Sequence, residues 1–515
     1  MRIFDTYVQK LKYKVLTELA RQTWVGNDAF SVFNDIANQV VKKGEPTMSC
    51  CIYKDRAIVA ERIRIALGGK KEDHNVIQVI DIACDECPVA GHVVTDLCRG
   101  CVAHACVDAC KLGAITVDSH QKAEIDKSKC VECGKCAKSC PYSAIANFKR
   151  PCERACKVDA ISMAPDGVAQ IDSEKCIECG ACVYKCPFGA TLDVSSITDI
   201  IKTIVDSDNN KNYHVHAIVA PAIAGQFQYA KAGQLISAIR ELGFYAVEEV
   251  ALGADIVAYK EAQELQEKGF LTSSCCPAFV KYIKMKFPQL AEHISHNLSP
   301  MAETGKLIKE QDPAAKIVFI GPCTAKKGEV RKPEVHQYVD YVMTFEELQA
   351  MIDSKDIAVD QLPETELDTA TYYGRVFART GGLSEAVTEA VREQKAAAEA
   401  AKADAPDGAG TSGAVASGEA GASGKPENGD GACDGDSADS KPFVFDPIVC
   451  DGIDSCKTAL LRASKGLLPN NFIEGMVCTD GCIGGAACLS HGNADKRAID
   501  NYGKKATHKE IRDVL

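Results

Sequence analysis

The chain has 515 residues, a formal net charge of −12 and 27 cysteines. Its length allows several domains with sizeable cores, and its acidic charge excludes a nucleic-acid partner. It has no run of about 18 apolar residues and no apolar signal segment, so we expect a cytoplasmic protein with no membrane partner. Thiols stay reduced in that compartment, so dense cysteines indicate metal binding rather than disulfides.

Residues 1–80 precede the dense cysteine runs, and we expect a mainly helical region there. Residues 81–195 contain the runs CVECGKCAKSCPYSAI and CIECGACVYKCPFGAT. Both have the C-x2-C-x2-C-x3-C-P spacing of two-cluster ferredoxins, in which three thiolates bind one cubane and the fourth binds its neighbour. A zinc site, usually two separated CxxC pairs, does not explain this spacing.

The cysteine runs form an internal repeat, because the half-motifs end alike in CKLGAI, CPYSAI, CKVDAI and CPFGAT. We therefore expect two ferredoxin-like units in tandem. Crossing the fourth ligands assigns three 4Fe–4S sites: Cys98, Cys101, Cys106 and Cys140; Cys110, Cys130, Cys133 and Cys136; and Cys156, Cys176, Cys179 and Cys182. A fourth site can be built from the remaining Cys84, Cys87, Cys152 and Cys186. The alternative for these last four is buried free thiols.

A different pattern, spanning 210–515, begins after the cysteine runs. HAIVAPAI, AVEEVAL and KIVFIGPC are strand candidates, and GQLISAIRELGF and GADIVAYKEAQELQEKG are helix candidates. This alternation predicts an α/β domain. Residues 392–442 have almost no large apolar side chains, so we expect a disordered insertion there.

Cysteines return in three loops of the α/β domain, SSCCP, GPCTAKKGE and GMVCTDGCIGG. In this order the loops resemble the three signatures of FeFe-hydrogenases. The resemblance covers the chain apart from 392–442, and residues 1–80 resemble the second major subgroup (group B-like) of monomeric enzymes. It implies a tandem ferredoxin-like 4Fe–4S domain followed by an α/β H-cluster domain. The implied activity is reversible reduction of protons to H2 with electrons from ferredoxin or a similar small carrier.

The resemblance also implies the cofactor and its ligands. The cubane of the H-cluster would be bound by Cys276, Cys323, Cys478 and Cys482. Cys482 would also bridge to a di-iron unit bearing CO, cyanide and an azadithiolate, which implies maturation enzymes as partners. Lys326 matches the lysine that donates a hydrogen bond to a cyanide, with a solvated lysine as the alternative. Further positions around the pocket are Met476, Ala220, Pro221, Ala222 and Glu329.

The two adjacent cysteines have different implied roles. Cys276 is a cluster ligand, whereas Cys275 matches the family thiol that stays free and passes protons to the dithiolate amine. A thiol with an ordinary pKa of about 8.5 can hold that proton at neutral pH. Glu261, Glu264 and Ser295 match the rest of the family's proton path. The alternative for the glutamates is that they solvate a surface helix.

Some positions depart from the family pattern, notably Gly321 for methionine and Phe279 for tryptophan. Two other functions are considered beside the enzyme. One is a hydrogen or redox sensor carrying an H-cluster, which the absence of a recognisable sensory domain disfavours. The other is an iron–sulfur assembly protein without the di-iron unit, which Cys275 and Lys326 disfavour.

Overall fold

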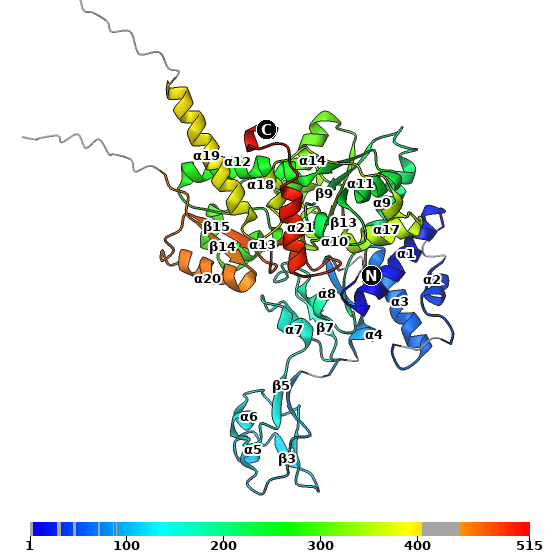
Figure 1. The fold of residues 1–515 in the computed structure, drawn as a ribbon. Helices are drawn as coiled ribbons and strands as arrows, with labels where there is room; N and C mark the ends of the chain where they lie inside the picture. Colours follow the sequence, from blue (N-terminus) through cyan, green and yellow to red (C-terminus); the bar gives the residue numbers. More distant parts are fainter. Residues whose placement is uncertain are drawn as a thin grey trace, which may run out of the picture.

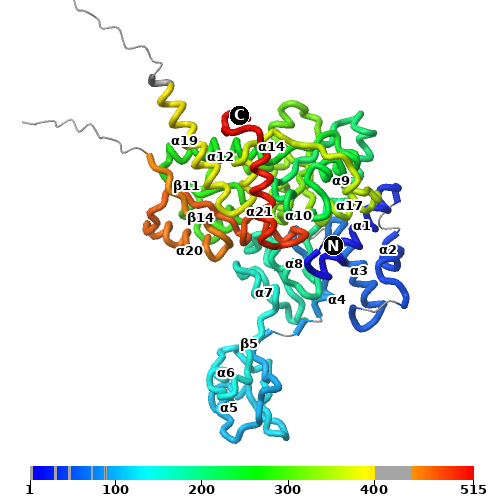
Figure 2. The backbone as a smooth tube through the Cα atoms, viewed as in Figure 1, coloured from blue at the N-terminus to red at the C-terminus, as the bar shows by residue number. Residues whose placement is uncertain are grey.

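The structure is a computed structural model that describes residues 4–27, 32–44, 48–70, 73–85, 87–88, 90–403 and 443–515. Figure 1 shows a broad body and, below it, a small lobe that contains β3, β5, α5 and α6. Figure 2 shows a narrow connection between the lobe and the body beside β5. Among the described residues, every helix is too short or too polar to span a lipid bilayer.

The described part of residues 1–80 is mainly helical. Its helices are α1 (Tyr7–Trp24), α2 (Phe33–Val40) and α3 (Ile52–Ala66). Helix α1 begins at a capping box between Thr6 and Gln9, which satisfies two free backbone donors. Its apolar face packs on α9 (Ile197–Asp206) and α17 (Phe345–Ser354), so this region belongs to the core of the body.

The two ferredoxin-like units are nested. The lobe (residues 91–148) lies between Cys87 and Cys152, inside the cysteine set of the second unit. In the lobe, β2 pairs antiparallel with β5 and places Gly91 opposite Phe148, so both ends of the lobe leave at the same point. Lobe elements are β2 (Gly91–Val94), α5 (Ala105–Asp108), β3 (Ile115–Val117), β4 (Ala123–Ile125), α6 (Lys135–Ser139) and β5 (Ile145–Phe148).

The second ferredoxin-like unit lies against the body. Strand β1 closes it by pairing antiparallel with β8. Its elements are β1 (Ile77–Val79), α4 (Asp81–Cys84), α7 (Pro151–Ala155), β6 (Ile161–Met163), β7 (Ala169–Ile171), α8 (Ala181–Lys185) and β8 (Thr191–Asp193).

The C-terminal α/β part of the body contains two parallel sheets, in agreement with the predicted α/β pattern. The first has the order β10-β9-β12-β13, and the second β11-β15-β14. All five residues of β9 are buried, as expected for a parallel sheet covered by helices on both faces. The strands are β9 (Val215–Val219), β10 (Ala246–Glu249), β11 (Leu271–Thr272), β12 (Lys316–Gly321), β13 (Tyr341–Thr344), β14 (Pro447–Asp451) and β15 (Phe472–Met476).

Helices connect and cover these strands, and the long α12 packs on both α14 and α19. The remaining elements are α10 (Ile223–Gln226), α11 (Ala232–Glu241), α12 (Val250–Lys268), α13 (Pro277–Lys286), η1 (Pro288–His293), α14 (Pro300–Gln311), α15 (Ala325–Glu329), α16 (Pro333–His336), η2 (Val359–Gln361), α18 (Tyr372–Val376), α19 (Gly382–Ala403), α20 (Ile453–Ala463), η3 (Cys482–Gly484), α21 (Asn493–Gly503) and η4 (Ile511–Val514).

The predicted insertion at 392–442 begins too early. Residues 392–403 form the last turns of α19, so they are helical rather than disordered. This stretch is rich in alanine, glutamate and lysine, which favour a helix even where few large apolar side chains are present. The rest of the prediction, residues 404–442, lies outside the described residues.

Candidate metal centre and proton path

The three cysteine loops all begin at the carboxyl ends of parallel strands. Cys275 and Cys276 follow β11, Cys323 follows β12, and Cys478 follows β15. Carboxyl ends of parallel strands meet at one edge of a sheet, where ligands bind in open α/β proteins. The two sheets therefore bring loops that are distant in sequence to one centre.

The centre contains four thiols that affect one another electrostatically. Burial raises the pKa of Cys323 to about 11 and of Cys482 to about 12, and the Cys276 thiol adds to both shifts. Burial also raises the pKa of Cys478 well above its ordinary value, with Cys323 and Cys276 contributing. A group of four cysteines, three of which resist ionisation, fits an iron–sulfur cubane, because soft thiolate ligands select such clusters and the metal deprotonates them.

Lys326 is buried at this centre, which excludes the alternative of a solvated lysine. Its Nζ lies 2.7 Å from Oε2 of Glu329 and donates to the carbonyl oxygen of Cys275 at 3.4 Å. Burial alone would lower the pKa of Lys326, but Glu329, followed by Cys323 and Cys275, raises it. The ammonium is therefore a fixed positive charge, and the role of Glu329 is to keep it charged and in place.

The remaining predicted pocket residues lie at the strand ends. Met476 is the last residue of β15, is 3% exposed and belongs to the same apolar cluster as Cys275. Ala220, Pro221 and Ala222 are buried where β9 ends. The backbone of Ala220 donates to the carbonyl oxygen of Ile320 at 2.9 Å, which holds this strand end beside the loop of Cys323.

Cys275 begins a buried polar path toward the surface. Burial, with Glu261 contributing, raises the pKa of Cys275 well above its ordinary value, so the thiol retains its proton. Glu261 on α12 accepts from the amide of Ser274 at 3.3 Å, and burial raises its pKa to about 7. Ser295 also lowers the pKa of Glu261, and its hydroxyl donates to Glu264 Oε2 at 3.2 Å. The solvation alternative is excluded for Glu261, which is fully buried.

The path ends at a histidine that sequence reasoning missed. His296 Nδ1 lies 2.7 Å from Oε1 of Glu264, and the His296 side chain is 73% exposed. Lys268 Nζ donates to the same oxygen at 2.7 Å. The only signal in the sequence is that His296 directly follows Ser295. Histidine exchanges protons near neutral pH, so this position is suited to the solvent end of a proton path.

The structure brings each of the four predicted accessory cysteine sets to one cavity. In the lobe, one cavity is lined by Cys98, Cys101, Cys106 and Cys140, and another by Cys110, Cys130, Cys133 and Cys136. In the second unit, one cavity is lined by Cys84, Cys87, Cys152 and Cys186, and a larger one includes Cys156, Cys176, Cys179 and Cys182. The crossed pairing therefore describes the spatial groups.

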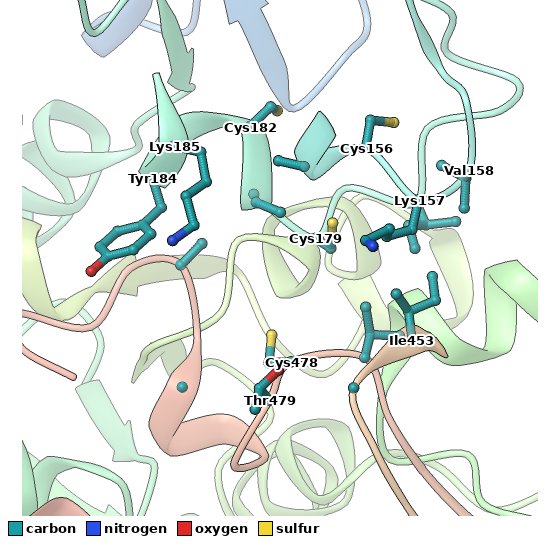
Figure 3. A pocket seen from close by; sticks show the side chains of 18 of the residues that line it. Cys156, Lys157, Val158, Cys179, Cys182, Tyr184, Lys185, Ile453, Cys478 and Thr479 are labelled. Atoms are coloured by element: carbon teal, nitrogen blue, oxygen red, sulfur yellow. The ribbon is translucent and has the colours of Figure 1, made fainter. Parts of the chain in front are cut away.

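The Cys156 set faces the centre formed by the three cysteine loops. Its cavity of about 950 Å³ also reaches Cys478, and Figure 3 shows Cys179 and Cys478 on facing walls. Next to Cys179, the carbonyl oxygen of Glu178 accepts from the Thr324 hydroxyl at 2.7 Å. Lys281 on α13 lies 3.2 Å from the Glu178 carboxylate. These contacts hold the Cys156 set directly beside the loops that carry Cys276 and Cys323.

Comparison with known families matches both parts of the chain. The family "Iron only hydrogenase large subunit, C-terminal domain" matches residues 213–486. The family "4Fe-4S dicluster domain" matches residues 97–144 and 150–190.

Individual relatives include hydrogenases and an assembly factor. Iron hydrogenase 1 of Clostridium pasteurianum is 29% identical over 308 residues, covering 54% of this chain and 52% of that protein. The chain thus spans about half the length of this relative. The cytosolic Fe-S cluster assembly factor NAR1 of Kluyveromyces lactis is 37% identical over 95 residues, covering 18% of this chain and 20% of that protein. The solved FeFe-hydrogenase HydA1 of Chlamydomonas reinhardtii has a TM-score of 0.46 and 20% identity, covering 62% of this chain and 92% of that one.

Proposed function

Because the chain belongs to the iron-only hydrogenase family, we propose that it catalyses the reversible reduction of protons to H2 with electrons from ferredoxin or a similar small carrier. The observation that carries the proposal is the buried path from Cys275 to the surface beside four converging thiols. We place the enzyme in the cytoplasm, with maturation enzymes supplying the di-iron unit.

The residues of the centre divide the chemical work. Cys276, Cys323, Cys478 and Cys482 would bind the H-cluster. When bound, the H-cluster supplies the di-iron unit at which protons and electrons combine. Lys326 supplies a buried positive charge to its anionic ligands, an arrangement that costs no reorganisation during the reaction. Cys275 holds a proton beside this position without being a ligand.

Protons move between Cys275 and the surface through side chains on α12 and the loop after η1. His296 exchanges protons with water and with Glu264, to which it is hydrogen-bonded. Ser295 links Glu264 to the buried Glu261. With a pKa of about 7, Glu261 can both accept and release a proton at neutral pH.

Electrons would reach the centre through 4Fe–4S clusters bound at the four cysteine sets. The two lobe sets are the outermost, and the Cys156 set is beside the centre. The Cys84 set joins them, because Cys87 and Cys152 flank the two points where the chain enters and leaves the lobe. A Cys84→Ser/Cys87→Ser variant should therefore contain about four iron atoms fewer than the wild-type protein. Unchanged iron content would leave the four residues as free thiols.

The decisive experiment compares single substitutions of three cysteines in anaerobically matured protein. Cys275→Ala should keep the infrared bands of CO and cyanide but lose H2 evolution by about 100-fold or more, because only the proton donor is removed. Cys276→Ala should lose the infrared bands as well. Cys488→Ala is the matched control, since this buried thiol donates only to backbone carbonyl oxygens, those of Ile483 and Cys482, and lies outside the proton path.

The same experiment separates the proposal from its alternatives. Fully loaded Cys275→Ala protein with wild-type turnover would refute the role of Cys275. Wild-type protein without CO and cyanide bands after maturation would favour an assembly protein, like the cytosolic Fe-S cluster assembly factor of Kluyveromyces lactis. Wild-type protein with both bands but very slow turnover would favour a sensor.

A further inference from the structure

A second cluster of metal-ligating side chains lies at the other end of the parallel sheet. We propose that His214, His216 and Asp312 bind one divalent transition-metal ion, of which Zn²⁺ is the best fit. One ring nitrogen from each histidine and one carboxylate oxygen of Asp312 all lie within 4.8 Å of one another. A metal ion placed between these three atoms would contact all of them after small movements of the side chains.

The cluster is separate from the cysteine centre. His216 is the second residue of β9, whereas Ala220 at the cysteine centre follows the last residue of that strand. The strand rise separates these two positions by roughly 13 Å. Asp312 caps the C-terminus of α14, before β12. The site would thus join the amino end of β9 to the loop that leads into β12.

His216 has the hydrogen bonding of a metal-binding histidine. Its Nδ1 lies 2.8 Å from Oε1 of Glu248, and its residue is 8% exposed. Its Nε2 is buried and has no hydrogen-bond partner among the described residues. A carboxylate that accepts from one ring nitrogen fixes the tautomer in which the other nitrogen offers its lone pair to a metal. A buried polar atom without a partner is costly, and a bound ion would satisfy it.

His214 and Asp312 supply the other two ligands. His214 Nδ1 lies 2.7 Å from Oδ2 of Asp312, so the pair already shares a proton that a metal ion can replace. Tyr245 stacks on the His214 ring with the ring centres 3.8 Å apart, which limits rotation of the imidazole. Glu248 would remain in place as the hydrogen-bond acceptor that orients His216.

The donor set selects the ion. Two imidazoles and a carboxylate are nitrogen and oxygen ligands that suit Zn²⁺ and exclude a thiolate-bound cluster. Three protein ligands leave a fourth tetrahedral position for water or a small anion. Because the ligands come from β9 and the end of α14, binding should stabilise the folded catalytic part. At an ion concentration well above Kd, we expect its melting temperature to rise by about 5 °C.

The test uses full-length protein with its iron–sulfur clusters loaded, so that cluster cysteines are occupied. After addition of one equivalent of Zn²⁺, X-ray absorption at the zinc edge should give nitrogen and oxygen neighbours at about 2.0 Å with imidazole outer-shell scattering. His216→Gln and Asp312→Asn should lose this signal and the rise in melting temperature. If the variant at the buried His216 does not fold, Asp312→Asn still tests the site, because Asp312 is partly exposed and asparagine has the same size. His293→Gln removes a histidine from η1 and should change neither.

Three outcomes would overturn the proposal. Sulfur neighbours at about 2.3 Å would mean that free cysteines take the zinc. An unchanged nitrogen signal in the folded Asp312→Asn and His216→Gln variants would assign the zinc to other histidines. Failure of the wild-type protein to retain zinc after gel filtration would leave the cluster as a hydrogen-bonded His–Asp pair.

Discussion

Lys327 lies next to the site residue Lys326, but its contacts are structural. We therefore expect Lys327→Met to destabilise the protein. The Lys327 ammonium donates to Oδ2 of Asp193 at 2.7 Å, to Oε1 of Glu347 at 2.8 Å and to the carbonyl oxygen of Val194 at 2.7 Å. The side chains of Lys327, Asp193 and Glu347 are at most 4% exposed. The lysine therefore joins the end of the second ferredoxin-like unit to α17 of the catalytic part.

The magnitude follows from what the substitution leaves behind. Removing one partner of a buried ion pair costs about 3–5 kcal/mol, because the other charge stays buried without compensation. Asp193 keeps Lys12, whose Nζ lies 2.5 Å from its Oδ1, whereas Glu347 keeps the backbone amide of Thr344, which donates to its Oε2 at 2.6 Å. We therefore expect the lower end of the range, about 3 kcal/mol, and a decrease in melting temperature of about 3–5 °C.

The assay is thermal unfolding of the cluster-loaded protein, followed by circular dichroism and by cluster absorbance. The Lys327→Met/Glu347→Gln double variant should recover at least half of the loss. The uncompensated carboxylate is then gone, while the side-chain amide oxygen that replaces it can still accept from the Thr344 amide. Lys175→Met, which removes an exposed partner of Asp172, should leave the melting temperature unchanged. A Lys327→Met variant as stable as wild type, or no recovery in the double variant, would refute this reasoning.

Three further predictions concern the proton path, the packing of the centre and the lobe. Burial raises the pKa of Glu261 to about 7. Above pH 7 this carboxyl loses its proton, so H2 evolution should fall. Glu261→Gln should lower H2 evolution by about 100-fold and remove this pH dependence. The raised pKa also means that the folded protein binds this proton more tightly than the unfolded chain. Stability from Glu261 should thus fall as the pH rises from about 4 to about 7, and thermal unfolding at pH 8 should find Glu261→Gln no less stable than wild type. Gly475→Ala would place a Cβ 2.2 Å from the buried ring of Phe279 on α13. The free energy of unfolding should therefore fall by about 1–3 kcal/mol. A melting temperature like that of wild type would contradict the packing argument. Replacing the lobe (91–148) by a short linker should remove about eight iron atoms and ferredoxin-linked activity but retain dye-linked activity. Loss of both activities from a protein whose other clusters are loaded would contradict the proposed electron route.

The sequence by itself determined the parts of the site that are encoded in local spacing. The C-x2-C-x2-C-x3-C-P runs restrict which thiols can reach one cubane, and the crossing of the fourth ligand follows from the same short spacing. The four accessory cysteine sets therefore agree with the four cavities, even though the lobe separates Cys87 from Cys152. The ligand roles of Cys276, Cys323 and Cys478 came instead from the resemblance of their loops to the FeFe-hydrogenase signatures, and in the structure each loop follows a parallel strand.

Composition was a weaker guide than spacing. It predicted disorder from residue 392, yet α19 continues to Ala403, because alanine-rich sequence can form a helix without large apolar groups. The alternation of strand and helix predicted the α/β class, but the order of strands in the two sheets depends on long-range pairing that no local pattern encodes.

Only the tertiary structure decided which side chains from distant elements meet. His296 lies at the end of the proposed proton path because its loop passes Glu264 on α12, and Lys327 is structural because α15 lies between Asp193 and Glu347. In the sequence, nothing distinguishes His214 and His216 from ordinary histidines at the start of a strand. They form a candidate metal site only because the end of α14 brings Asp312 to them. In each case the energy of the contact comes from burial and from a partner far away in the sequence, and both exist only after the chain has folded.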